Sequence, residues 1–182
     1  MGKKFRFAVL LPIMPITKAT AADVPELSVL VNSAYRGESS KKGWTTEAHL
    51  LDGIRIDEET LSGYFDDPQV TILKNTNEDG QITGCVYLEK RPPKLYVGMF
   101  SVSPVLQAGG IGRALLLAAE DFAREVDCPT LTMTVISTRH ELISWYERRG
   151  FNATGETQPF HDGKKFGVPR QEIELIVLEK GV

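Results

Sequence analysis

The stretch Gln107–Leu116, QAGGIGRALL, places three glycines within four residues and then continues as a helix-forming run. An apolar segment typical of a buried strand, 95–102, precedes it. A glycine-rich turn that leads into a helix exposes backbone N–H groups without intrahelical partners, and the helix dipole adds roughly half a positive charge there. Such a turn binds anions, above all phosphate. The alternative is a tight connection that needs glycine only for its positive φ.

Around this turn, hydrophobic periodicity predicts a single domain that mixes helices and strands. The strands before and after the helix 111–126 should be parallel, because a right-handed crossover joins them. The preceding strands form an antiparallel meander whose hairpin turn is NTNEDG. We expect helices at 23–35, 57–65, 111–126 and 139–149, a brief helix capped by Thr46, and strands at 13–20, 69–75, 81–89, 95–102, 130–136, 155–160 and 172–180.

Composition limits the classes of protein that fit. The 182 residues with 42% hydrophobic content bury one core, so we expect a domain over 13–182 after an extension, 1–12. A net charge of −3 gives no electrostatic footprint for nucleic acid. The two cysteines, Cys85 and Cys128, have no CxxC or CxH neighbour, which indicates neither a zinc site nor a redox pair and favours a reduced, cytoplasmic protein.

The N-terminus has an alternative interpretation as a signal peptide. MGKKFRF is basic, AVLLPIMPI is apolar, and Ala19-Thr20-Ala21 resembles a cleavage site. Against export, Pro12 and Pro15 interrupt the apolar run, and Lys18 precedes the cleavage point. No run approaches the roughly 20 apolar residues of a membrane span. We therefore expect neither export nor a membrane partner.

Two usual phosphate-binding patterns fail at the glycine turn. A dinucleotide fingerprint that starts at Gly110 needs glycine where Leu115 stands. A P-loop needs Lys-Ser/Thr after Gly112, where the chain has Arg113-Ala114. The three histidines show no metal-ligand spacing, and no GxSxG elbow is present. The residues favour chemistry without a metal.

The strand, glycine turn and following helices resemble those of the GNAT superfamily of acetyl-CoA-dependent N-acyltransferases. Gln107, Gly110 and Gly112 match its motif Gln/Arg-x-x-Gly-x-Gly/Ala after the fourth strand, and Trp145–Phe151, WYERRGF, matches its later helix pattern. The resemblance covers about 13–180 and is strongest over 96–151. The chain departs from the family at Arg139, where an Asn is frequent.

The resemblance implies an α/β (α+β) fold with a mixed central sheet of about six to seven strands, flanked by helices and splayed by a bulge between the fourth and fifth strands. Acetyl-CoA would lie in that gap, with its pantetheine along 100–102 and its pyrophosphate on the amides of 108–113. An arginine at position 139 could reach a CoA phosphate. The predicted cofactor-binding residues are Phe100, Ser101, Val102, Gln107, Ala108, Gly109, Gly110, Ile111, Gly112, Arg113, Arg139 and Tyr146.

Acetyl transfer to a primary amine by direct attack needs an acid and a route for a proton, because an amine like that of lysine has a pKa of about 10.4. The resemblance makes Tyr146 the candidate acid that protonates the CoA thiolate; the alternative is a core aromatic. Where some relatives carry a fourth-strand carboxylate, this chain has Tyr96. Glu89, expected opposite Tyr96 on the same sheet face, is the candidate base, or else a solvated strand-end carboxylate.

The expected acceptor is a small amine, an amino acid or a peptide amine. The first helical region and the last hairpin should supply its contacts. The candidate residues are Tyr35, Arg36, Trp44, Glu47, Tyr96, Phe160 and His161. A non-catalytic acetyl-CoA-binding or sensing domain is the second function class, and the acyl group and the assembly, a homodimer included, stay open.

Overall fold

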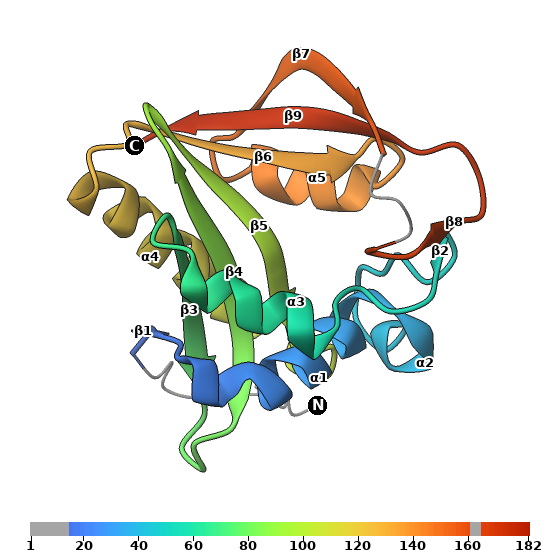
Figure 1. The fold of residues 1–182 in the computed structure, drawn as a ribbon. Helices are drawn as coiled ribbons and strands as arrows, with labels where there is room; N and C mark the ends of the chain where they lie inside the picture. The colour runs from blue at the N-terminus through green and yellow to red at the C-terminus, as the bar shows by residue number, and fades with distance from the viewer. Residues whose placement is uncertain (1–14, 161–164) are drawn as a thin grey trace, which may run out of the picture.

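Seven strands of the computed structural model form one mixed sheet, in the order β1-β3-β4-β5-β6-β9-β7 (Figure 1). The structure describes residues 15–160 and 165–182, so the predicted extension 1–12 and His161 lie outside the described residues. This architecture confirms the predicted fold class. The strands are β1 (Thr17–Lys18), β3 (Val70–Thr76), β4 (Ile82–Arg91), β5 (Lys94–Val102), β6 (Thr130–Ile136), β7 (Asn152–Pro159) and β9 (Glu174–Gly181).

β5 and β6 are the parallel pair, and they separate after a short contact. Their pairing runs only from Lys94↔Thr130 to Tyr96↔Thr132, although β5 continues to Val102. Beyond Tyr96, β5 keeps its partner β4 on one side while its other edge is not paired with β6. Counted along the chain within this sheet, with the short β1 included, β5 and β6 are the fourth and fifth strands, so the predicted splay is confirmed.

A β-bulge on β5 marks the place where the gap opens. Tyr87 pairs with Gly98 and Cys85 with Ser101, so Met99 and Phe100 together oppose Val86. Met99 has a φ of 46°. An extra residue exchanges the two faces of a strand, because side chains alternate with a period of two. Val97 therefore packs in one core cluster and Met99 in the other.

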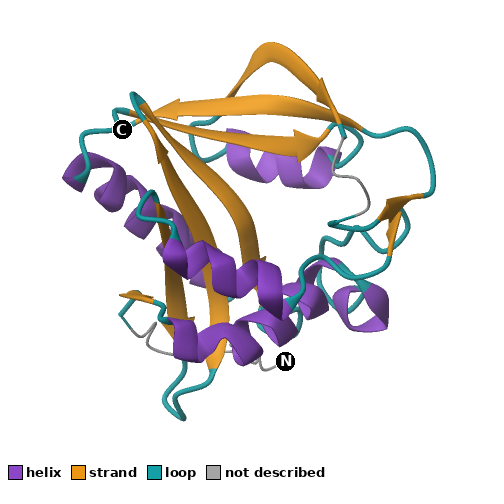
Figure 2. Cartoon of the chain, in the orientation of Figure 1, coloured by secondary structure: helices purple, strands orange, loops and turns teal. Residues whose placement is uncertain are grey.

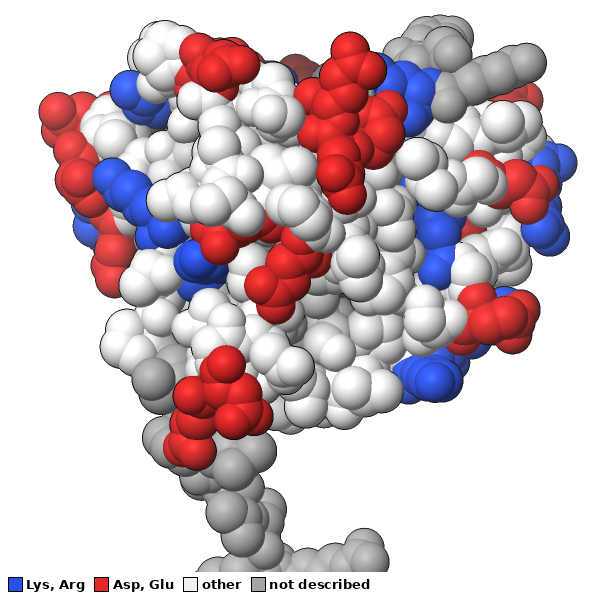
Figure 3. Space-filling model, turned by 60° about the horizontal axis from the view of Figure 1, so that its bottom comes forward, with Lys and Arg blue, Asp and Glu red and all other residues white. Residues whose placement is uncertain are grey.

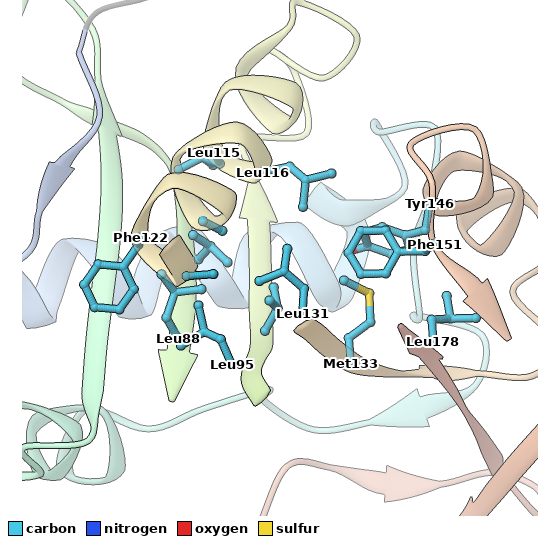
Figure 4. Packing of buried hydrophobic residues seen from close by; sticks show 14 of the residues in the cluster. Leu88, Leu95, Leu115, Leu116, Phe122, Leu131, Met133, Tyr146, Phe151 and Leu178 are labelled. Atoms are coloured by element: carbon cyan, nitrogen blue, oxygen red, sulfur yellow. The ribbon is translucent and has the colours of Figure 1, made fainter. Parts of the chain in front are cut away.

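Helices cover both faces of the sheet (Figure 2). α4 (Ile111–Glu125) and α5 (His140–Glu147) share the larger core cluster with one face. Figure 4 shows Leu115, Leu116 and Phe122 of α4 lying over Leu88, Leu95 and Leu131 of the strands, with Tyr146 and Phe151 beside Met133. The apolar period predicted for α4 makes this stripe.

The opposite face is covered by the N-terminal helices. α1 (Val24–Tyr35) and α3 (Glu58–Gly63) bury Leu27, Val31 and Leu61 against Ile72 and Cys85 of the sheet. Asp57 caps α3, because its carboxylate accepts the Thr60 N–H at 2.7 Å. Both helices lie where the sequence pattern predicts them.

The helix predicted after Thr46 is wrong. The short helix of this region is α2 (Gly37–Ser40), and the following residues form turns. Thr46 instead turns its hydroxyl to the Ser40 hydroxyl at 2.6 Å and accepts the Ala48 N–H at 3.1 Å. A second sheet that the pattern did not predict pairs β2 (Leu51–Asp52) with β8 (Val168–Pro169). It ties this region to the C-terminal part.

On the face shown in Figure 3, the acidic and basic side chains of the described residues lie in small separate groups around a broad uncharged area. They do not gather into one basic surface there. None of the helices in the described part of the chain is both long and apolar enough to cross a membrane.

Candidate active site

The glycine turn joins β5 to α4 with an unusual backbone. Ala108 and Gly110 have φ values of 66° and 92°, and α4 begins directly after Gly110. The first helical bond runs from the Ala114 N–H to the Gly110 carbonyl at 3.0 Å. Gly110 has no side chain to cap the helix, so the N–H groups of 111–113 have no intrahelical partner. This arrangement suits an anion.

A cavity of about 400 Å³ extends from this turn along the splayed edge of β5. Apolar and aromatic side chains make much of its wall, as in sites that hold elongated organic ligands. Its lining includes ten of the predicted cofactor-binding residues, namely Phe100, Val102, Gln107, Ala108, Gly110, Ile111, Gly112, Arg113, Arg139 and Tyr146.

The other two predicted cofactor-binding residues do not line this cavity. Ser101 pairs with Cys85 of β4, and its hydroxyl donates to the Met99 carbonyl at 3.1 Å. Successive backbone groups of a strand point to opposite sides, so Ser101 faces β4 while its neighbours face the gap. Gly109 turns its N–H to the Leu106 carbonyl at 3.3 Å. For these two residues, the predicted contact lacks geometric support.

Gln107 links the end of β5 to the loop that contains Trp44. Its Oε1 accepts the Trp44 N–H at 2.9 Å, and its Nε2 donates to the Val102 carbonyl at 3.3 Å. The Trp44 ring stacks on the Trp145 ring with 6.5 Å between centroids. Trp44, predicted to contact the acceptor, therefore lies in the wall of the first cavity and not the second.

Three arginines gather where the first cavity meets a shallow hollow beside α4. Arg113, Arg148 and Arg149 line both spaces. Arg149 lies 3.5 Å above the Trp145 ring and donates to the Trp145 carbonyl at 2.8 Å. Burial lowers the pKa of Arg149, and repulsion from Arg148 and Arg113 lowers it further. An anion bound among these side chains would relieve that repulsion.

A second cavity, of about 320 Å³, lies on the far side of the splay. Five predicted acceptor residues line it: Tyr35, Arg36, Glu47, Tyr96 and Phe160. Arg36, Glu47 and Arg139 are only 5–7% exposed. The Glu47 carboxylate accepts from Arg139 at 2.8 Å and also pairs with Arg36, whose other terminal nitrogen donates to the Phe166 carbonyl at 2.7 Å. Glu47 is therefore neutralised inside the protein and is not a free anchor for an amine.

The same cluster bears on the role predicted for Arg139. One terminal nitrogen holds Glu47, and the other donates to the Thr45 hydroxyl. Its Nε lies 3.7 Å from a Glu141 oxygen. These partners hold both terminal nitrogens in the wall between the cavities, which weighs against a contact of this guanidinium with a CoA phosphate.

Both cavities share one wall, made by Tyr35, Phe100, Arg139, Leu142 and Tyr146. The Tyr35 hydroxyl donates to the Phe100 carbonyl at 3.1 Å, and burial raises the Tyr35 pKa to about 12. Tyr146 is 4% exposed, and its burial raises the pKa well above the ordinary value of about 10. Tyr146 therefore stays protonated at neutral pH, as a proton donor must.

Glu89 pairs with Tyr96 across β4 and β5, as the sequence predicts, but it lines neither cavity. Its carboxylate accepts from Arg91 at 2.6 Å and from the Tyr87 hydroxyl at 3.0 Å. The hydrogen bond from Arg91 lowers the Glu89 pKa, and that from Tyr87 lowers it further. A lowered pKa makes a weaker base, so this geometry weighs against the predicted role.

Among residues 15–160 and 165–182, no three His, Cys, Asp or Glu side chains are grouped as metal ligands. Cys85 and Cys128 are both buried and unbridged.

A family model described as "Acetyltransferase (GNAT) family" matches residues 36–151, which include the glycine turn, the splay and α5. The chain belongs to this acetyltransferase family. The resemblance inferred from the glycine motif and WYERRGF is thus confirmed. In this GNAT protein, both motifs lie in the match, and each contributes residues to the wall of the first cavity.

Relatives and solved structures agree with the family. A mycothiol acetyltransferase of Rhodococcus erythropolis is 25% identical over 71% of this chain; the chain spans only 43% of that relative's length. The ribosomal-protein-S18-alanine N-acetyltransferase of Escherichia coli has the same fold, with a TM-score of 0.69 at 17% identity over 92% of this chain and 93% of that one. A Thermoplasma acidophilum N-acetyltransferase, PaiA, solved with coenzyme A, has a TM-score of 0.70 at 20% identity, over 92% and 98% of the two chains.

Several lining residues were not predicted. Trp145, Arg148 and Arg149 stand in the stretch WYERRGF, and the paired arginines were a signal of positive charge beside the glycine turn. Arg55 and Phe166 of the second cavity have no local signal, because they reach it from distant parts of the chain.

Proposed function

We propose that this GNAT protein transfers an acetyl group from acetyl-CoA to a primary amine by direct attack, without a covalent enzyme intermediate. The observation that carries this proposal is the shared wall. One cavity leads from the glycine turn to Tyr146, and the other leads to Tyr146 from the opposite side of the splay. Two substrates entering from the two sides would meet there, which is the proximity that direct transfer needs.

The first cavity suits acetyl-CoA in both charge and shape. The N–H groups of 111–113 and the three arginines would hold phosphates, while Trp145, Phe100 and Val102 would line the pantetheine. Glycine at position 112 leaves this space to the ligand, since even a Cβ there would contact Trp145 at 3.5 Å and Phe100 at 3.6 Å. The PaiA neighbour, solved with coenzyme A, supports the assignment.

The chain's own groups would assist the reaction at two atoms. A backbone N–H on the splayed edge of β5, within 100–102, would stabilise the charge that develops on the thioester oxygen, worth on the order of 3 kcal/mol when well aligned. Tyr146 would donate its proton to the departing thiolate. Tyr146 carries this proton at neutral pH, and its raised pKa also makes the hydroxyl a weaker acid.

The arginines give a prediction about cofactor affinity. Arg113→Gln and Arg148→Gln should each raise the KM for acetyl-CoA about two- to fivefold with kcat little changed, because exposed ion pairs contribute about 0.2–1 kcal/mol. The effect should shrink at high salt. Arg124→Gln is the matched control. Arg124 lies on α4, as Arg113 does, pairs with Asp121 at 2.8 Å and lines none of the three cavities. Steady-state kinetics at two salt concentrations make the measurement, and an unchanged KM in both cavity variants would oppose the assignment.

Glu89 can be tested directly. We expect Glu89→Gln to keep the pH dependence of kcat/KM for the amine, since Glu89 lies outside both cavity walls and its pKa is lowered. The amine would then lose its proton to solvent. If kcat/KM for the amine no longer falls toward lower pH in this variant, Glu89 is the base after all.

The activity itself is tested by incubating the full chain with acetyl-CoA and a pooled panel of amines. Release of free thiol, together with an acetylated amine seen by mass spectrometry, is the expected result. Omission of the amines is the control for thioester hydrolysis. Tight acetyl-CoA binding without acetylation of any amine would instead favour a non-catalytic acetyl-CoA-binding domain.

A further inference from the structure

One guanidinium in the second cavity lies over two aromatic rings. Arg55 lies with its Cζ 5.2 Å from the centroid of the Tyr35 ring and 4.7 Å from that of Phe166. Its backbone is fixed as well, because the Arg55 N–H donates to the Asn32 Oδ1 at 2.7 Å. Two aromatic contacts and an anchored backbone hold the guanidinium in the cavity wall.

The N–H groups of this guanidinium have no hydrogen-bond acceptor in the part of the chain that the structure describes. Arg55 makes neither an ion pair nor a side-chain hydrogen bond with another described residue, whereas Arg36 and Arg139 both bind Glu47. Stacking uses the faces of the planar group, and hydrogen bonds use the N–H groups in its plane. Arg55 thus offers the fork that binds a carboxylate through two parallel hydrogen bonds.

The charge of the cavity favours the same ligand. Among its described lining residues, Arg36, Arg55 and Arg139 are basic and Glu47 is the one acid. Glu141, 44% exposed in its side chain, adds a partial counter-charge beside Arg139. Positive charge is still in excess, and a cavity lined by charge of one sign attracts a ligand of the opposite sign.

We propose that the acceptor is a small amine that also carries a carboxylate, and that Arg55 binds this carboxylate while the amine points to the shared wall. The volume of about 320 Å³ lies near the lower end for small-molecule sites, which favours a ligand of amino-acid size. This inference rests on the proposed function only in placing the acceptor in the second cavity.

The test compares each of the twenty common α-amino acids with its isosteric amide, together with dipeptides that carry an acidic second residue. Binding to the full chain is measured by calorimetry with coenzyme A present, and turnover is measured separately by thiol release. The separate binding measurement matters because the α-amine of an amino-acid amide has a lower pKa than that of the acid, so more of it is unprotonated and able to react at neutral pH. We expect at least one free acid to bind tenfold or more tightly than its amide. If a dipeptide with an acidic second residue and an amidated C-terminus binds as tightly as the best free acid, the carboxylate that Arg55 binds belongs to a peptide side chain. That result would overturn a free amino acid as the acceptor.

Variants of Arg55 decide whether this side chain makes the selection. Arg55→Met keeps an apolar stem between Tyr35 and Phe166 and should remove most of the preference for the acid, while Arg55→Lys should restore part of it. Arg124→Met, an arginine outside the cavities, should keep the wild-type preference. Thermal melts of all three variants establish that they are folded.

The outcomes separate this inference from the proposed function. Selective binding of acids that Arg55→Met abolishes supports the inference, even if no acetyl group is transferred and only the proposed function fails. Acetylation of amines with no preference for the carboxylate supports the proposed function and overturns the inference. Binding of neither series, or a preference that persists in Arg55→Met, also overturns it.

Discussion

Gly112→Val is expected to weaken acetyl-CoA binding at least tenfold while the protein stays folded. Gly112 lies in the first turn of α4 with a φ outside the left-handed region, so valine meets no backbone conflict there. A Cβ would sit in ordinary contact with Trp145 and Phe100. The added methyl groups would then fill the space beside the free N–H groups and hold the pyrophosphate away from them. A tenfold loss corresponds to about 1.4 kcal/mol.

Calorimetry of acetyl-CoA binding checks this result, with a thermal melt to establish folding. Gly110→Val should weaken binding as much, but its φ of 92° adds backbone strain. Gly80→Val is the matched control for that strain: Gly80 has a φ of 80° in the β3–β4 turn, and a Cβ added there would meet no neighbouring atom within 4 Å. The control should lose stability and keep the wild-type affinity. Unchanged affinity in a folded Gly112→Val would remove the pyrophosphate from this turn.

Tyr146→Phe should lower kcat by one decade or more with little change in the KM for acetyl-CoA. The ring would keep its packing against Phe100, Trp145 and Phe151, so the cavity walls stay in place. Only the proton donor is lost, and each decade corresponds to about 1.36 kcal/mol of transition-state stabilisation. Because the Tyr146 pKa is raised, its own titration should leave wild-type activity unaffected through neutral and mildly alkaline pH.

Steady-state kinetics and a pH profile to the alkaline side make this measurement. Tyr64→Phe is the matched control, since burial raises the Tyr64 pKa as well but Tyr64 lines neither cavity. It should keep the wild-type kcat. A kcat within twofold of wild type in Tyr146→Phe would reduce Tyr146 to a core aromatic, which is the alternative the sequence leaves open.

The sequence predicts well what neighbouring residues determine. The hairpin of β3 and β4, the amphipathic α4 and the glycine turn each follow from local period and turn chemistry, and the structure has them at nearly the predicted positions. Even the pairing of Glu89 with Tyr96 follows from a tight turn at Arg91–Lys94. The predicted helix after Thr46 is absent, although the Thr46 hydroxyl accepts the Ala48 N–H as a cap would: residues 48–50 form a turn and the chain then enters β2.

The buried charges of the second cavity could not be predicted in this way. Arg139 meets Glu47 across 92 positions of sequence, and Arg36 meets the Phe166 carbonyl across 130. Such contacts depend on how the layers pack, and one sequence gives no local signal for them. From the sequence alone, Glu47 is a single acidic residue in a polar loop, which suggests that it is free to bind an amine. In the folded chain, Glu47 is buried between two guanidinium groups.

The most direct test of the central claim is a crystal structure of this protein with acetyl-CoA. We expect the pyrophosphate within hydrogen-bonding distance of the N–H groups of 111–113 and the thioester sulfur beside the Tyr146 hydroxyl, at the wall that both cavities share. Acetyl-CoA bound elsewhere, with the glycine turn free of phosphate, would contradict it.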